Sequence, residues 1–144
     1  MAEQDTVRLL RECDAGVRMG TASIDEVLDY VSSPKLKKRL ADCKSQHEVL
    51  KGQLQQLLDD HHDEGKAPNP AAKGMSWMKT NMKLAWDGSD NTIADLMTDG
   101  CNMGVKSLHR YLNQYKAADA KSKKITKELI NLEEGLVMDI REFL

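Results

Sequence analysis

The chain has few aromatic residues, few prolines and no long apolar run. These features limit the classes of protein to which it can belong. Aromatic residues make up 4% of its 144 residues, and there are three prolines. No stretch reaches the roughly 18 to 20 apolar residues that a helix needs to cross a bilayer. Residues 1–5 lack the basic-then-apolar pattern that opens a signal peptide. We therefore expect a cytoplasmic protein with no transmembrane segment.

The chain also lacks an excess of positive or negative charge, and it lacks recognised catalytic motifs. The charged residues, 31% of the chain, nearly cancel to a net charge of −2. This balance suits a soluble helical protein and gives no broad basic bias toward nucleic acid. The sequence contains no glycine-rich phosphate loop, no Gly-x-Ser-x-Gly elbow, no Cys-x-x-Cys pair and no zinc-protease motif. These absences argue against an enzyme, and we assign no residue a catalytic or cofactor-binding role.

The three cysteines, Cys13, Cys43 and Cys101, are an odd number and form no close pair. Each of them falls within a helical pattern of apolar residues. We therefore expect buried thiols in preference to a disulfide or a catalytic nucleophile.

The strongest positive signal is an apolar seam that contains a histidine. Between Pro34 and Asp63 the spacing alternates between four and three residues, which is one face of a helix packed against other helices. The pattern aims His47 at the interior of a bundle, where such folds place metals. The seam consists of Leu36, Leu40, Cys43, His47, Leu50, Leu54, Leu57 and His61.

Similar patterns along the chain predict a single all-α domain over residues 1–144. The connection between the second and third long helices holds about 30 residues, enough to return to the end where the second helix began. The third helix would then run parallel to the second, which is the ferritin-like up-down-down-up arrangement with one long crossover. The expected helices cover residues 5–31, 34–62, 92–116 and 120–144, with a short helix over 75–86 in the crossover.

Local signals mark the helix ends and one close packing contact. Asp5 is expected to cap the first helix, and Ser33 to cap the second with Pro34 at its first position. Gly100 and Gly104, one turn apart, favour close packing of the third helix, with Gly16 and Gly20 of the first as candidate partners. A ligand cavity and a dimer interface are the alternatives for these glycines.

Three stretches resemble a family of uncharacterised bacterial proteins with a ferritin-like four-helix bundle, distantly similar to rubrerythrin and ferritin bundles. The resemblance extends over most of residues 5–144 and implies the fold more strongly than an activity. By analogy with the family it also implies a bacterial stress or housekeeping role. The stretches are Ser33-Pro34-Lys35-Leu36-Lys37, Trp77-Met78-Lys79 to Trp86-Asp87-Gly88-Ser89-Asp90, and Lys106-Ser107-Leu108-His109-Arg110-Tyr111.

The chain departs from the metal-binding pattern of these wider relatives, which needs inward carboxylates on the first and third helices and a Glu-x-x-His motif on the other two. Lys44 stands three residues before His47, and the fourth helix has no histidine. Only His47, Asp14 and Glu133 remain as inward metal-ligand candidates. We therefore expect a degenerate site without a complete diiron centre.

His47 has a simpler interpretation as a buried neutral histidine, hydrogen-bonded to a polar group such as Asp14, Thr21 or Gln46. The cluster from His61 to Glu64 could bind zinc or nickel adventitiously, but histidines near a helix C-terminus also complement its dipole.

Two functional hypotheses follow from these residues. The first is a non-enzymatic bundle that acts through protein association, as a homodimer or with another protein. The second is a metal-binding redox or storage protein that holds iron or manganese through His47. A phosphotransfer or sensor module is a weaker third hypothesis, because it needs an exposed histidine.

Overall fold

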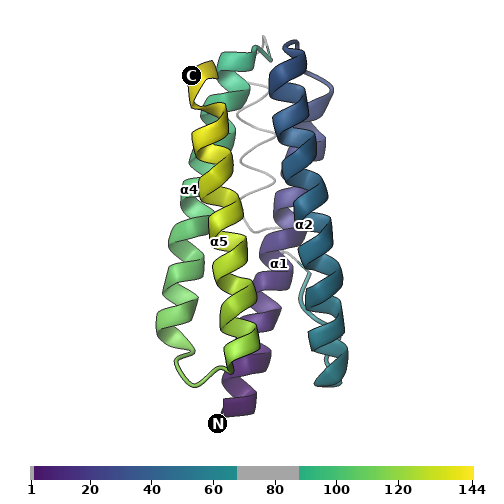
Figure 1. Ribbon diagram of the computed structural model, residues 1–144, viewed down its shortest axis with the longest axis vertical. Helices are drawn as coiled ribbons and strands as arrows, with labels where there is room; N and C mark the ends of the chain where they lie inside the picture. Colours follow the sequence, from purple (N-terminus) through teal and green to yellow (C-terminus); the bar gives the residue numbers. More distant parts are fainter. Residues whose placement is uncertain (1, 68–87) are drawn as a thin grey trace.

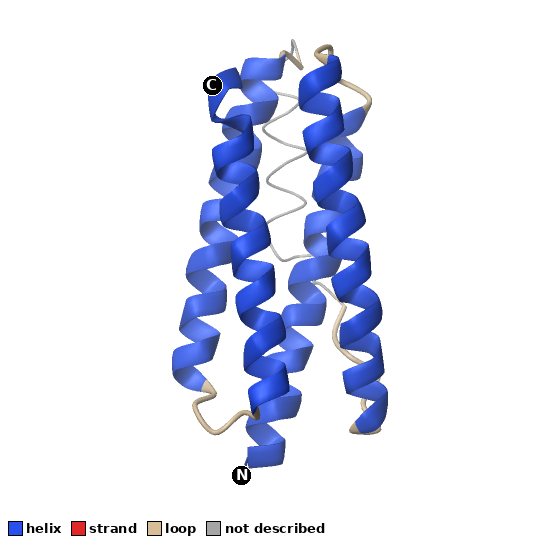
Figure 2. Cartoon of the chain, viewed as in Figure 1, coloured by secondary structure: helices blue, strands red, loops and turns tan. Residues whose placement is uncertain are grey.

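The computed structural model describes residues 2–67 and 88–144, and these form four long helices and no strand (Figure 1; Figure 2). The prediction of an all-helical bundle is confirmed, and the short helix predicted over 75–86 lies outside the described residues. Within this part of the chain, no helix has both the length and the apolar character that crossing a bilayer requires. The helices are α1 (Ala2–Leu28), α2 (Pro34–Asp60), α4 (Asp90–Gln114) and α5 (Ala120–Ile140), followed by the short 3₁₀ helix η1 (Arg141–Phe143).

Side chains cap three of the four long helices at their N-termini. The Ser33 hydroxyl accepts a hydrogen bond from the Leu36 amide at 3.3 Å, and Pro34 occupies the first turn, as predicted. Ser89 caps α4 and Asp119 caps α5 in the same way. Each cap satisfies an amide that has no partner inside its own helix.

The predicted cap at Asp5 is wrong, because α1 begins at Ala2 and already includes this residue. Its carboxylate instead accepts a hydrogen bond from the Ala117 amide at 3.0 Å, in the turn between α4 and α5. The other ends differ from the prediction by a few residues. The helix α1 stops at Leu28 and α2 at Asp60, where His62 adopts a positive φ of 56°.

Hydrogen bonds accepted by the Asp90 carboxylate place the start of α4. This carboxylate accepts from the amides of Ser32 at 2.8 Å and Ser33 at 2.9 Å, in the turn between α1 and α2. The helix α4 therefore starts where α2 starts, and the two helices run in the same direction (Figure 1). The pair α1/α2 packs beside the pair α4/α5, with α2 against α5 and α1 against both α4 and α5.

The core consists of two apolar clusters stacked along the bundle. One extends from Leu9 to Val17 on α1 and includes Leu50 and Leu129. The other lies beyond it and includes Ile24, Leu40 and further residues of α4 and α5. Two close contacts lie between the clusters and belong to neither, one joining α1 to α2 and the other joining α4 to α5. We call the four residues that make these contacts, Gly20, His47, Gly104 and Glu133, the mid-bundle layer.

The Asp90 contacts predict a specific loss of stability. Replacing Asp90 by alanine removes two charge-assisted hydrogen bonds and should lower the free energy of unfolding by about 2 kcal/mol. Urea titration measures the loss. Asp95→Ala, an exposed acidic position on the same helix, is the control and should change stability little. Equal effects of the two substitutions would contradict the role given to Asp90.

Candidate functional site

In the mid-bundle layer, each polar side chain packs on a glycine of the neighbouring helix. A Cβ atom added at Gly20 would lie 2.8 Å from Nε2 of His47, and one added at Gly104 would lie 2.5 Å from Oε2 of Glu133. Both distances are too short for real contacts, so the glycines make room for these side chains. The same arrangement therefore occurs twice, in the pair α1/α2 and in the pair α4/α5.

The glycine contacts only partly match the sequence prediction. Gly20 and Gly104 are sites of close packing, but each packs against a polar side chain and not against the other glycines. Gly16 has only an ordinary contact with Leu129, and Gly100 has open space around it. The prediction of close packing is therefore wrong for Gly100.

His47 is a buried histidine whose two ring nitrogens have different surroundings. The side chain is 2% exposed, and Nδ1 lies 2.8 Å from the backbone carbonyl of Cys43, which it can bond only as a donor. The other nitrogen, Nε2, is buried without a hydrogen-bond partner. Burial lowers the pKa of His47, although the Cys43 carbonyl partly opposes this shift. The ring is therefore neutral near pH 7, and a backbone carbonyl takes the place of the predicted side-chain partners.

Asp14, the second predicted ligand, binds the segment that follows α2. Its carboxylate accepts from the Lys66 amide at 3.0 Å and pairs with Arg18 at 3.2 Å. Gly65, with a φ of +87°, packs directly against it. Asp14 lies six residues before Gly20, about 9 Å along the helix. Its oxygens are thus engaged away from the mid-bundle layer.

Glu133, the third candidate, lies in the layer with no balancing charge. The residue is 8% exposed, and its Oε2 atom has no hydrogen-bond partner. Burial raises the pKa of Glu133 to about 8, because the charged form is poorly solvated there. The side chain is therefore mostly protonated at pH 7.

The three cysteines are free and buried, as predicted. Burial raises the pKa of Cys13 and of Cys43 to about 12, and it raises the pKa of Cys101 further. The negative charge of Glu133, when present, adds to the rise at all three. Since the thiolate is the reactive form, these thiols are poor nucleophiles near neutral pH.

The three predicted metal ligands, His47, Asp14 and Glu133, do not come together as one cluster in the structure. Across residues 2–67 and 88–144, no three histidine, cysteine, aspartate or glutamate side chains converge as a metal would require. Gly20 and Gly104 occupy the layer on α1 and α4, the two helices that should supply carboxylates. At the end of α2, His61 lies 3.5 Å from Glu3, and Asp63 accepts from the Gly65 amide.

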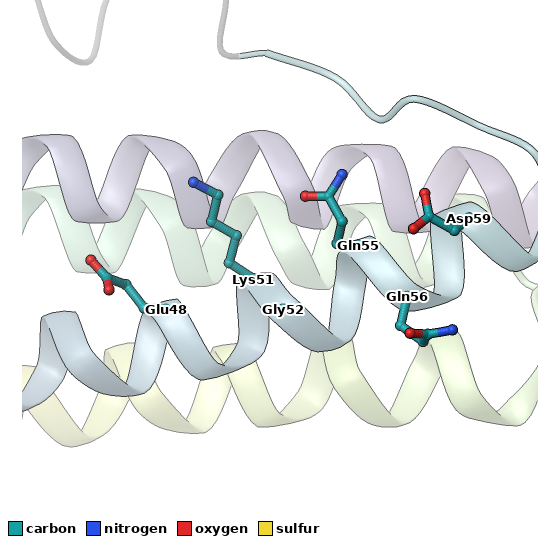
Figure 3. Close-up of a pocket in the computed structure, with 6 residues that line it drawn as sticks. All are labelled: Glu48, Lys51, Gly52, Gln55, Gln56 and Asp59. Atoms are coloured by element: carbon teal, nitrogen blue, oxygen red, sulfur yellow. The ribbon is translucent and has the colours of Figure 1, made fainter.

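A hollow of about 500 Å³ lies on the outer side of α2 and was not predicted from the sequence (Figure 3). Gly52 lies between charged and amide side chains there, and a Cβ atom added to it would meet nothing within 4 Å. An exposed glycine in the middle of a long polar helix was the one signal that could have indicated the hollow. Its described lining residues are Glu48, Lys51, Gly52, Gln55, Gln56 and Asp59.

No protein-family model matches the chain, and no curated protein or solved structure matches it either.

Alanine substitutions at Gly20 and Gly100 should have opposite effects on the free energy of unfolding. Gly20→Ala should lower the free energy of unfolding by about 1–3 kcal/mol, because the new methyl group collides with the buried His47 ring. Gly100→Ala should raise it by about 0.5–1 kcal/mol, because alanine favours the helix and the site is open. Thermal and urea unfolding measure both changes. Stabilisation by Gly20→Ala would contradict the described contact.

Proposed function

We propose that the protein is a ferritin-like bundle without a dinuclear metal centre and that it acts by associating with a second copy of itself. The mid-bundle layer supports the first part of this proposal, that the bundle has no dinuclear metal centre. Gly20 and Gly104 stand where α1 and α4 would need carboxylates, and the oxygens of Asp14 are engaged elsewhere. The parallel course of α2 and α4 supports the ferritin-like order of helices.

The hollow on α2 supports the second part (Figure 3). Small-molecule sites are mostly enclosed and apolar, whereas this surface is open and lined by charged and amide groups. Glu48 and Lys51 give it both signs of charge, and Val49 beside them is 62% exposed. In an antiparallel two-fold arrangement centred midway between Glu48 and Lys51, Lys51 of each copy lies opposite Glu48 of the other, so the two charges are complementary across the axis.

Sedimentation equilibrium tests this association. The wild-type protein should form dimers, and Gly52→Arg should raise the dissociation constant at least tenfold, because a large side chain fills the hollow. Gly100→Arg is the matched control, since this glycine of α4 is also exposed with open space around it, and it should leave the constant unchanged. A monomeric wild-type protein, or equal effects of both variants, would contradict the proposal.

Iron or manganese binding through His47, with Asp14 and Glu133 as further ligands, is the second candidate function. It is favoured by the buried atoms Nε2 of His47 and Oε2 of Glu133, which have no hydrogen-bond partner.

Metal analysis of protein purified without an affinity tag distinguishes the two functions. Our proposal predicts much less than one equivalent of iron or manganese, unchanged by His47→Gln. One or more equivalents that disappear in His47→Gln, and persist in the control His109→Gln at an exposed position, would favour the metal-binding function instead.

A further inference from the structure

An excess of positive charge lies at one end of the bundle, where α4 ends and α5 begins (Figure 1). Residues 105–127 contain seven lysine or arginine residues and one aspartate, which gives a net charge of +6. Because the whole chain carries −2, its other residues together carry −8. We call the seven cations the basic surface. They are Lys106, Arg110, Lys116, Lys121, Lys123, Lys124 and Lys127.

Two contacts fix how α4 lies beside α5 at this end of the bundle. Gly104 packs on Glu133, and Nζ of Lys123 donates a hydrogen bond to the backbone carbonyl of Lys116 at 2.6 Å. The last turns of α4 therefore run alongside the first part of α5, and the basic surface extends over about 15 Å of the two helices. Six of its seven residues are exposed, and Lys123 is partly buried.

Neighbouring acids do not balance the basic surface. Among the described residues, no ion pair includes one of its seven cations, and the cations that do form ion pairs all precede α4 in the chain. Asp119 is the one acid among residues 105–127, and its carboxylate caps α5. Glu128 follows Lys124 by about one turn but forms no ion pair with it. The surface therefore presents a net positive charge to a partner.

The kinds of side chain at this end favour a lipid surface over a nucleic acid as the anionic partner. Six of the seven cations are lysines, which act as hydrated point charges, whereas arginine is preferred for the paired hydrogen bonds that recognise phosphates and bases. Tyr111 and Tyr115 stack on each other, with ring centres 6.4 Å apart, and pack on the core, so they do not provide an open platform for unpaired bases. An anionic bilayer requires only positive charges near its surface, without a fixed spacing.

We propose that the basic surface binds the anionic head groups of a lipid bilayer and holds the bundle against the bilayer by its α4–α5 side. The rest of the chain, with its net charge of −8, is repelled by the same head groups, so the bundle binds in one orientation. This inference depends neither on the association through α2 nor on the absence of a metal.

Sedimentation with lipid vesicles tests the proposal. The wild-type protein should sediment with vesicles of phosphatidylcholine and phosphatidylserine but not with vesicles of phosphatidylcholine alone. Salt at about 1 M, where the Debye length is about 3 Å, should release it. The triple variant Lys106→Gln, Lys124→Gln and Lys127→Gln removes three exposed cations that form no ion pair. Because each cation near the bilayer changes the affinity roughly fivefold, this variant should bind about a hundredfold more weakly.

The matched control removes the same charge from the other end of the bundle. Lys35→Gln, Lys37→Gln and Lys38→Gln lie at the start of α2, where Glu142 and Asp42 already balance two of the three cations. This variant should bind the vesicles like the wild-type protein, and circular dichroism should show the same helix content in all three proteins.

Arginine at positions 106, 124 and 127 keeps the charge and should preserve vesicle binding. A wild-type protein that does not bind the phosphatidylserine vesicles, or equal losses in the two glutamine variants, would overturn the proposal. Release from the vesicles by a DNA duplex at the same phosphate concentration would also overturn it, because the surface would then prefer a nucleic acid.

Discussion

The packing of two polar side chains on two glycines is the constraint on which the rest of the structure depends. His47 fills the space above Gly20, and Glu133 fills the space above Gly104. These contacts lie between two apolar clusters, and Leu132 of α5 packs against both clusters. They also leave α1 and α4 without side-chain ligand atoms at this level, because both positions are glycines.

Two carboxylates hold the described residues on either side of the connection between α2 and α4. Asp14 binds the Lys66 amide just after α2, and Asp90 binds two amides of the turn between α1 and α2. Asp14 is buried, and Arg18 and the Lys66 amide satisfy its oxygens. Asp14 therefore has a structural role, although its position on the inner face of α1 made it a ligand candidate.

The sequence predicted the helices, the Ser33 cap and the burial of His47, because these depend on spacing within one segment. It did not predict that Glu133 packs on Gly104 or that Asp5 bonds the Ala117 amide, since both contacts depend on the register between helices distant in sequence. One signal was present but was not used. Between the two clusters, the apolar pattern of every helix is interrupted, by a glycine in α1 and α4 and by a polar residue in α2 and α5.

The most direct test of this account is the ionisation of Glu133 itself. Carbon-13 NMR of the labelled side-chain carboxyl group, followed from pH 4 to pH 10, reports its protonation in the folded protein. The account predicts a midpoint of about 8, because burial without a cation is what raises the pKa. A midpoint near the ordinary value of 4.5 would mean that a positive charge or a metal faces the carboxylate, and it would contradict the description of the mid-bundle layer.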